Sequence, residues 1–88
     1  MRTADLVIEI RLGLHARPAS DFVACARRFT SDVYVRNATK SDRLFDAKSP
    51  MHLLAANLAY GDVLHIETEG PDEREAIEAL VEVVRSAS

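Results

Sequence analysis

The spacing of apolar residues switches repeatedly along this chain between the two-residue period of a strand and the period of about 3.6 residues of a helix. Leu6, Ile8 and Ile10 alternate with the residues at positions 7, 9 and 11, which are Val, Glu and Arg, and this alternation predicts a first strand with one buried face. From residue 16 onward the apolar positions follow helical spacing instead: Ala19, Phe22, Val23 and Ala26. This switch predicts a strand that leads directly into an amphipathic helix.

The middle of the chain contains signals for a hairpin and a short helix. Residues 32–36 and 43–47 are rich in strand-forming side chains, and the polar stretch 37–42 separates them. We therefore expect a hairpin with a long loop. Ser49 followed by Pro50 has the pattern of an N-cap with proline at the first helical position, which predicts a short helix.

Two further elements complete the expected order. Residues 63–68 alternate between apolar and polar side chains after a turn, which predicts a fourth strand. Asp72, with Glu75 three residues later, has the pattern of a helix cap. The residues that follow at helical spacing predict the apolar stripe of a last helix: Ile77, Leu80, Val81 and Val84. One-sided strands and amphipathic helices in the order βαββαβα predict an α+β open-faced sandwich, in which three helices cover one face of a four-stranded antiparallel sheet.

Length and composition indicate what such a chain does not do. Eighty-eight residues suit one domain over residues 1–88, and a net charge of -3 gives little attraction to nucleic acid. No apolar run is long enough for a bilayer, so we expect no membrane insertion. The lone Cys25 cannot form an internal disulfide and is expected to be a small packing residue. We therefore expect a cytoplasmic protein, and a monomer. His52 and His65 have no ligands at metal spacing, so we expect solvated histidines, no metal and no cofactor.

The residues that can carry chemistry gather in the run Gly-Leu-His-Ala-Arg-Pro-Ala-Ser over residues 13–20, where the first strand gives way to the helix. Gly13 permits a sharp turn, and His15 then falls at the N-cap, where the backbone N–H groups of Ala16 and Arg17 are free to bind an anion. The imidazole is a nucleophile near neutral pH, and the Arg17 guanidinium can contact a phosphate oxygen. This segment predicts that His15 carries a phosphoryl group.

The run over residues 13–20, its place after the first strand and the element order resemble HPr, the histidine-containing phosphocarrier family of the bacterial phosphoenolpyruvate-dependent sugar phosphotransferase system. Ala47 to Met51 is similar to the family's Lys-Ser segment at its short second helix. The resemblance implies that phosphorylated enzyme I donates a phosphoryl group to Nδ1 of His15, that Arg17 assists, and that an enzyme IIA component accepts the group. The protein would then be an intermediate in phosphoryl transfer rather than a stand-alone enzyme.

The resemblance also implies a docking surface and a regulatory site. The family docks both partners on a face made by its first and second helices, and the corresponding residues here are Ser20, Arg27, Met51 and Leu54. Ser49 corresponds to the serine that an HPr kinase/phosphorylase modifies in some bacteria. A phosphate at that position would hinder the reaction with enzyme I.

Three features depart from the family pattern. Leu12 replaces a small polar residue, Pro50 replaces an apolar one, and the loop over residues 37–46 is longer by about three residues. A carrier of the nitrogen-related system, or one that serves a dihydroxyacetone kinase, therefore stays an alternative. A regulatory binding module without transfer is another, although the family's purely regulatory relatives lack the histidine that stands here as His15. The predicted open sheet face lacks the basic, aromatic platform of an RNA-binding sheet.

Overall fold

The computed structural model describes residues 1–88, and its seven elements follow the predicted order. The strands are β1 (Arg2–Val7), β2 (Asp32–Asn37), β3 (Phe45–Asp46) and β4 (Val63–Glu69), and the helices are α1 (Ala16–Arg27), α2 (Pro50–Ala55) and α3 (Glu73–Ser86). The strands form one antiparallel sheet in the order β1-β4-β2-β3. None of the helices is long and apolar enough to cross a bilayer.

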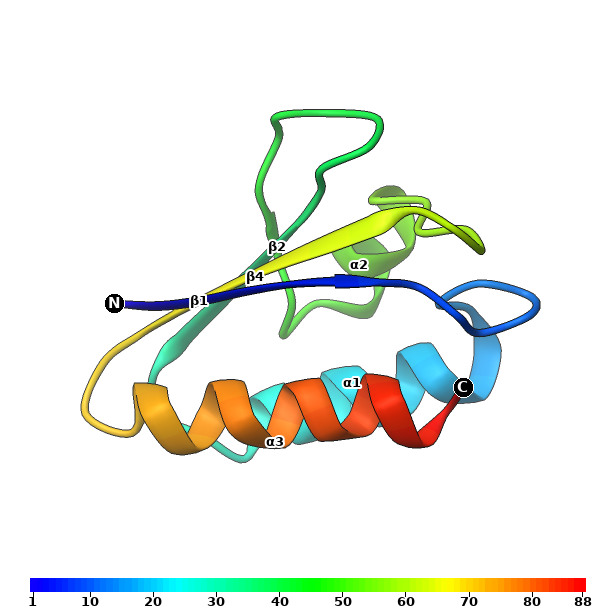
Figure 1. The fold of residues 1–88 in the computed structure, drawn as a ribbon. Coiled ribbons are helices and arrows are strands. Elements are labelled where there is room, and N and C mark those ends of the chain that lie inside the picture. Colours follow the sequence, from blue (N-terminus) through cyan, green and yellow to red (C-terminus); the bar gives the residue numbers. More distant parts are fainter.

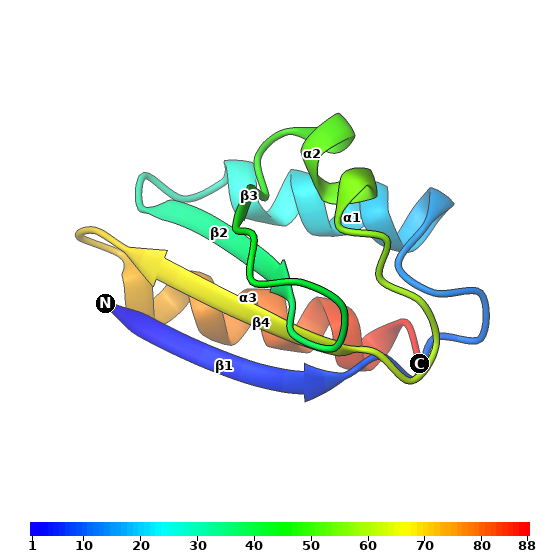
Figure 2. The same ribbon diagram turned by 90° about the horizontal axis from the view of Figure 1, so that it is seen from above.

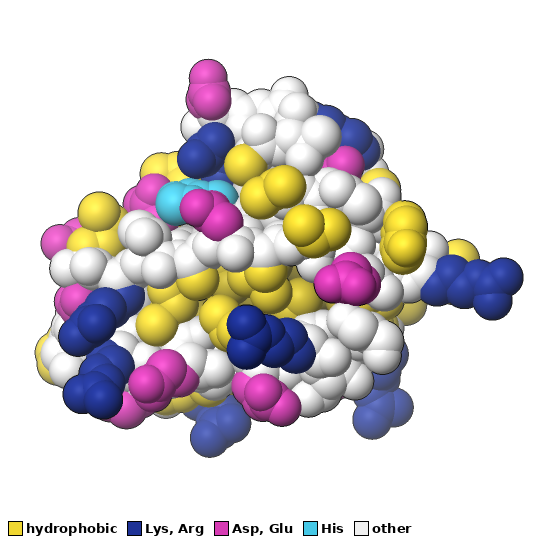
Figure 3. Space-filling view, viewed as in Figure 1, with side chains coloured by type: hydrophobic (Ala, Val, Ile, Leu, Met, Phe, Trp, Pro, Cys, Tyr) yellow, Lys and Arg dark blue, Asp and Glu magenta, His cyan; other side chains and the backbone are white.

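The predicted open-faced sandwich is confirmed. The long helices α1 and α3 lie side by side against one face of the sheet, and the opposite face is open (Figure 1). The short helix α2 contacts both α1 and β3 and closes the core beside them (Figure 2). In the view of Figure 3, a band of hydrophobic side chains lies between the sheet and the helices, with charged side chains around it.

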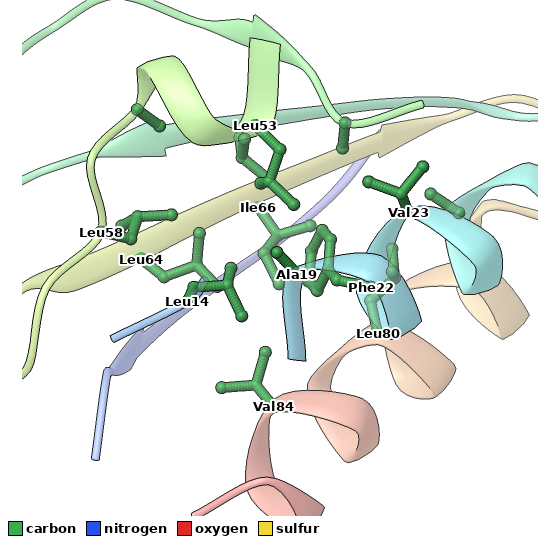
Figure 4. Close-up of a cluster of buried hydrophobic side chains, with 14 of the residues drawn as sticks. Leu14, Ala19, Phe22, Val23, Leu53, Leu58, Leu64, Ile66, Leu80 and Val84 are labelled. Carbon is green, nitrogen blue, oxygen red and sulfur yellow. The ribbon is translucent and has the colours of Figure 1, made fainter. Parts of the chain in front are cut away.

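The core fills the space between the sheet and the helices, as the one-sided apolar patterns predict. The core includes Leu53 of α2, Leu58 from the segment before β4, and Ile66 of β4. These side chains point into the same cluster as Phe22 of α1 (Figure 4). Burying each of these large side chains stabilises the fold by about 1.5–3 kcal/mol. Cys25 is also buried, in agreement with its predicted packing role.

The first strand begins and ends earlier than the alternation predicts. Its pairing with β4 runs from Arg2 to Val7, because β4 itself begins at Val63, opposite Val7. Ile8 and Ile10 are buried as expected, but they lie beyond the ladder. The apolar pattern therefore identified the buried face correctly and misplaced the hydrogen-bonded strand.

The third strand is shorter than predicted. Only Phe45 and Asp46 pair with β2, opposite Val35 and Tyr34, whereas the sequence suggested a strand over residues 43–47. The guanidinium of Arg43 lies 5.0 Å from the centre of the Phe45 ring, outside the ladder. β3 is an edge strand, and short edge strands limit pairing with other chains.

Asp72 precedes α3 as predicted, but its side chain does not cap that helix with Glu75. It accepts hydrogen bonds from the backbone N–H groups of Thr30 and Ser31, at 3.0 and 2.9 Å, and from the Ser31 hydroxyl. These bonds, first of all that of the Ser31 hydroxyl, lower the pKa of Asp72 to about 2. Asp72 therefore joins the loop that follows α1 to the start of α3.

The sequence suggested that His65 lies on a solvated surface, and this prediction is wrong. Its side chain is 12% exposed on the open sheet face, with Nδ1 2.6 Å from Asp5 Oδ1 and Nε2 2.8 Å from Glu67 Oε2. The pairing register explains this, because Asp5 lies directly opposite His65 on β1, and Glu67 follows two residues later on the same face of β4. His52 is exposed, as predicted.

Candidate functional site

His15 lies in the turn that connects β1 to α1, at the predicted N-cap position of α1. Gly13 adopts a φ of +81°, and a Cβ atom there would lie 2.6 Å from the carbonyl oxygen of Leu58. The N–H of Leu14 donates to the same oxygen at 2.8 Å, and the Leu14 side chain is buried. The turn is therefore held tightly against residues 56–62, and this contact fixes the backbone that leads into His15.

The His15 ring is half-buried and chemically available. Neither ring nitrogen forms a hydrogen bond with another group of the protein, and the side chain does not cap the helix. Leu12, which replaces a polar residue of the family pattern, is 83% exposed and has no side-chain donor for the ring. A ring nitrogen with no internal partner is free to react as a nucleophile.

The start of α1 is arranged to receive an anion. The N–H groups of Ala16 and Arg17 donate to no other group of the protein, and the first turn has no acidic residue. Ala16 has a φ of +50°, a left-handed conformation that costs a residue with a Cβ about 1–2 kcal/mol. Free N–H groups at the positive end of a helix bind negatively charged oxygens.

Arg17 follows this site in the first turn of α1, and its side chain pairs with Asp21 rather than with the His15 ring. Its side chain is 89% exposed, and its Nε lies 3.7 Å from Oδ1 of Asp21, one helical turn further on. Such an exposed pair is worth little in free energy, about 0–1 kcal/mol. The guanidinium can therefore leave Asp21 and turn toward an anion beside His15 at small cost.

A groove between α1 and α2 brings together three of the four predicted docking residues. Ser20, Arg27 and Leu54 line it, along with five others: Ala16, Ala19, Val23, Ala24 and Pro50. Met51 does not line the groove, but it follows Pro50 on α2 and is 80% exposed. Since the groove reaches Ala16, a partner seated in it would lie beside the His15 ring.

Hydrogen bonds set the position of the two helices that form the groove. Nε of Arg27 donates to the carbonyl oxygen of Lys48 at 2.9 Å, and Nζ of Lys48 donates to the carbonyl oxygen of Phe29 at 2.8 Å. These bonds hold the end of α1 against the residue that precedes Ser49. Ser49 is the predicted N-cap of α2, and its hydroxyl accepts a hydrogen bond from His52 N–H at 3.4 Å.

Residues 56–62 support the site, and sequence reasoning did not identify them. Leu58 presents its carbonyl oxygen to the His15 turn, and Asp62 and Gly61 exchange backbone hydrogen bonds with Ile8 at 2.8 Å each. No local pattern marks this contact, because it joins segments that lie far apart in the sequence. The sequence marks only the other side of the contact, where Gly13 permits a sharp turn.

Comparisons with known proteins agree with this arrangement. The family model described as "PTS HPr component phosphorylation site" matches residues 2–86. The chain is 42% identical over 74 residues to phosphocarrier protein HPr of Neisseria meningitidis serogroup B, with 84% of this chain and 80% of that protein covered. It is also 40% identical over 74 residues to HPr-like protein Crh of Halalkalibacterium halodurans, with 84% of each chain covered.

A solved structure extends the similarity to three dimensions. The crystal structure of HPr from Thermoanaerobacter tengcongensis superimposes with a TM-score of 0.92 at 38% identity, and the match covers 99% of this chain and 94% of that one. The family match therefore includes the fold, the turn and the histidine segment together. This chain belongs to the HPr family of the bacterial phosphotransferase system.

Proposed function

We propose that this chain accepts a phosphoryl group on Nδ1 of His15 from phosphorylated enzyme I and passes it to an enzyme IIA component in sugar uptake. One observation carries the proposal: the half-buried ring has no hydrogen-bond partner and stands beside two free N–H groups at the start of α1. This combination suits a nucleophile whose product is an anion.

The transfer needs few groups from the protein. The lone pair of Nδ1 attacks phosphorus, the bond between phosphorus and the donor breaks, and a phosphorus–nitrogen bond to His15 forms. The N–H groups of Ala16 and Arg17 and the Arg17 guanidinium stabilise the charge on the phosphoryl oxygens. In the second transfer the acceptor attacks phosphorus, and the bond to Nδ1 breaks. The chain is thus a carrier within a transfer sequence.

The groove between α1 and α2 is the proposed docking surface for both partners. Leu54 and Met51 offer apolar surface, and Ser20 and Arg27 offer polar contacts at its border. We propose that the carrier acts as one domain over residues 1–88 and as a cytoplasmic monomer.

A regulatory role is the second candidate, and the similarity to an HPr-like protein Crh favours it. On this hypothesis the groove binds a partner and Ser49, modified by an HPr kinase/phosphorylase, controls that binding. The presence of His15 favours the carrier role instead. Carriers of the nitrogen-related system or of a dihydroxyacetone kinase would use the same histidine with other partners.

Intact mass measurement tests the proposal directly. The protein is incubated with phosphoenolpyruvate, magnesium and enzyme I, and we expect the mass to increase by one phosphoryl group. Acid should destroy the linkage and alkali should spare it, because the imidazole of phosphohistidine leaves phosphorus easily once it is protonated. His15→Ala should abolish the modification, whereas His52→Ala on exposed α2 serves as the control and should keep it. A phosphorylated His15→Ala protein would overturn the assignment.

A further inference from the structure

A buried polar cluster lies behind the His15 turn, and the proposed phosphoryl transfer does not use it. Asn37, the last residue of β2, is 1% exposed, and Asp62, just before β4, is 7% exposed. Nδ2 of Asn37 donates to Oδ2 of Asp62 at 2.9 Å and to the carbonyl oxygens of Ala56 and Asn57 at 3.1 Å each. One amide group thus holds three points of residues 56–62.

The Asp62 carboxylate collects further donors on the same oxygen. Oδ2 accepts the N–H of Ala59 at 3.0 Å and Nζ of Lys40 at 3.0 Å, in addition to Asn37. These hydrogen bonds, that of Ala59 first and that of Asn37 next, lower the pKa of Asp62. A buried carboxylate with several donors is a rigid point in a structure, because each lost bond would leave a polar group without a partner.

The cluster reaches the His15 turn through one hydrogen bond. Among backbone hydrogen bonds that residues 13–15 donate, the bond from Leu14 N–H to Leu58 O is the only one that leaves the turn, since Gly13 and His15 donate to Ile10 and Gly13. Leu58 lies between the residues that Asn37 and Asp62 hold, namely Ala56, Asn57 and Ala59. Movement of residues 56–62 would therefore move the turn.

We infer that Asn37 and Asp62 are positioning residues for His15, an inference that rests on the proposed phosphoryl transfer. They act through Leu58 and touch neither the ring nor the phosphoryl group. In-line attack on phosphorus demands close alignment of the reacting atoms, and a displacement of about 1 Å is enough to slow such a reaction strongly. The cluster prevents that displacement from the opposite side of the turn.

Two substitutions of Asp62 separate positioning from general stability. Asp62→Ala removes the acceptor, whereas Asp62→Asn keeps a carbonyl oxygen for the donors of Ala59 and Asn37. We expect Asp62→Ala to slow the initial rate of His15 phosphorylation by enzyme I roughly ten-fold, and Asp62→Asn to restore most of that rate. The His15 ring resonances in nuclear magnetic resonance spectra should shift in the Ala variant and return toward wild type in the Asn variant.

Asp72→Ala is the matched control. It also removes a multiply bonded carboxylate, but Asp72 contacts Thr30 and Ser31, beyond the opposite end of α1 from His15. We expect this variant to lose stability while the phosphorylation rate and the ring resonances stay at wild-type values. All measurements are made well below the unfolding temperature of each variant. If Asp62→Ala does not fold, Asn37→Ala replaces it, because it removes the donor that joins the same segments.

The outcomes are distinct. If Asp62→Ala loses stability as Asp72→Ala does, but keeps the wild-type phosphorylation rate and ring resonances, the positioning inference is wrong. If wild type itself is not phosphorylated, the proposed function fails. In that case the ring resonances alone decide whether the cluster positions His15.

Discussion

A Cβ atom on Gly13 would lie 2.6 Å from the carbonyl oxygen of Leu58, closer than any real Cβ contact. The same oxygen accepts the hydrogen bond of Leu14 N–H. The turn before His15 and the segment before β4 are therefore in contact at backbone distance, and only glycine permits this. The position of the histidine depends on this approach as well as on the helix start.

Gly13→Ala should therefore destabilise the fold by more than its backbone conformation alone requires. Gly61→Ala is a matched control, because Gly61 has a similar φ of +87° with nothing within 4 Å of its missing Cβ. We expect the control to cost about 1–2 kcal/mol and Gly13→Ala to cost more, with slower phosphorylation of His15. Urea unfolding measures both free energies. Equal losses would show that the Leu58 contact yields without cost.

Arg17→Ala should slow phosphoryl transfer roughly ten-fold without unfolding the protein, because the side chain is 89% exposed and can contribute little to the core. Arg17→Lys should fall between the two, since lysine keeps the charge but not the planar fork. Rapid-quench measurement of His15 phosphorylation gives the rates. Asp21→Ala frees the guanidinium and should leave the rate unchanged or higher, and a wild-type rate in Arg17→Ala would mean that the backbone N–H groups suffice.

Met51→Glu should weaken binding of enzyme I, because it places a charge beside the apolar groove. Leu44→Glu provides the comparison, since Leu44 is also an exposed apolar residue but lies next to Tyr34 and Glu67, on the open face of the sheet. Calorimetric titration of both variants with enzyme I measures the two affinities. If Leu44→Glu weakened binding more than Met51→Glu, the proposal that enzyme I docks at the groove would be wrong.

Ser49 should behave first as a helix cap. Ser49→Ala should reduce the free energy of unfolding by about 0.5–1 kcal/mol, since the hydrogen bond to His52 N–H is long at 3.4 Å. Ser49→Asp keeps a capping side chain and adds a negative charge next to the groove. If the serine is regulatory, this variant should react more slowly with enzyme I while it stays folded. A wild-type initial rate would leave Ser49 as a cap alone.

Acid should destabilise the protein through Asp62 and Asp72. Both carboxyl groups have pKa values below their ordinary range in the folded state, that of Asp72 about 2 against an ordinary 3.8. The unfolded chain therefore binds protons more readily, and the stabilisation present at neutral pH is lost as the pH falls from about 4 toward 2. Asp72→Asn should be less stable at neutral pH and should lose less on acidification. Parallel slopes in urea unfolding against pH would contradict this.

The element order and the histidine segment were readable in the sequence because they depend on local patterns. Strand alternation and helical spacing identified the buried faces, and the run over residues 13–20 placed His15 at the start of α1. Ser49 and Pro50 marked α2 for the same reason, since capping depends on side chains within a few residues of each other. Their effects do not need the rest of the fold.

Only the tertiary structure decided which distant groups meet. The end of β1 depends on where β4 begins, and His65 is held by carboxylates of two strands. Asp72 accepts hydrogen bonds from the loop that follows α1 instead of capping its own helix. The hydrogen bond from Leu14 N–H to Leu58, and the bonds of Asn37 and Asp62 to the residues on either side of Leu58, belong to the same class. Such contacts join segments far apart along the chain, where pairing register and packing decide which hydrogen bonds form, and no local periodicity records them.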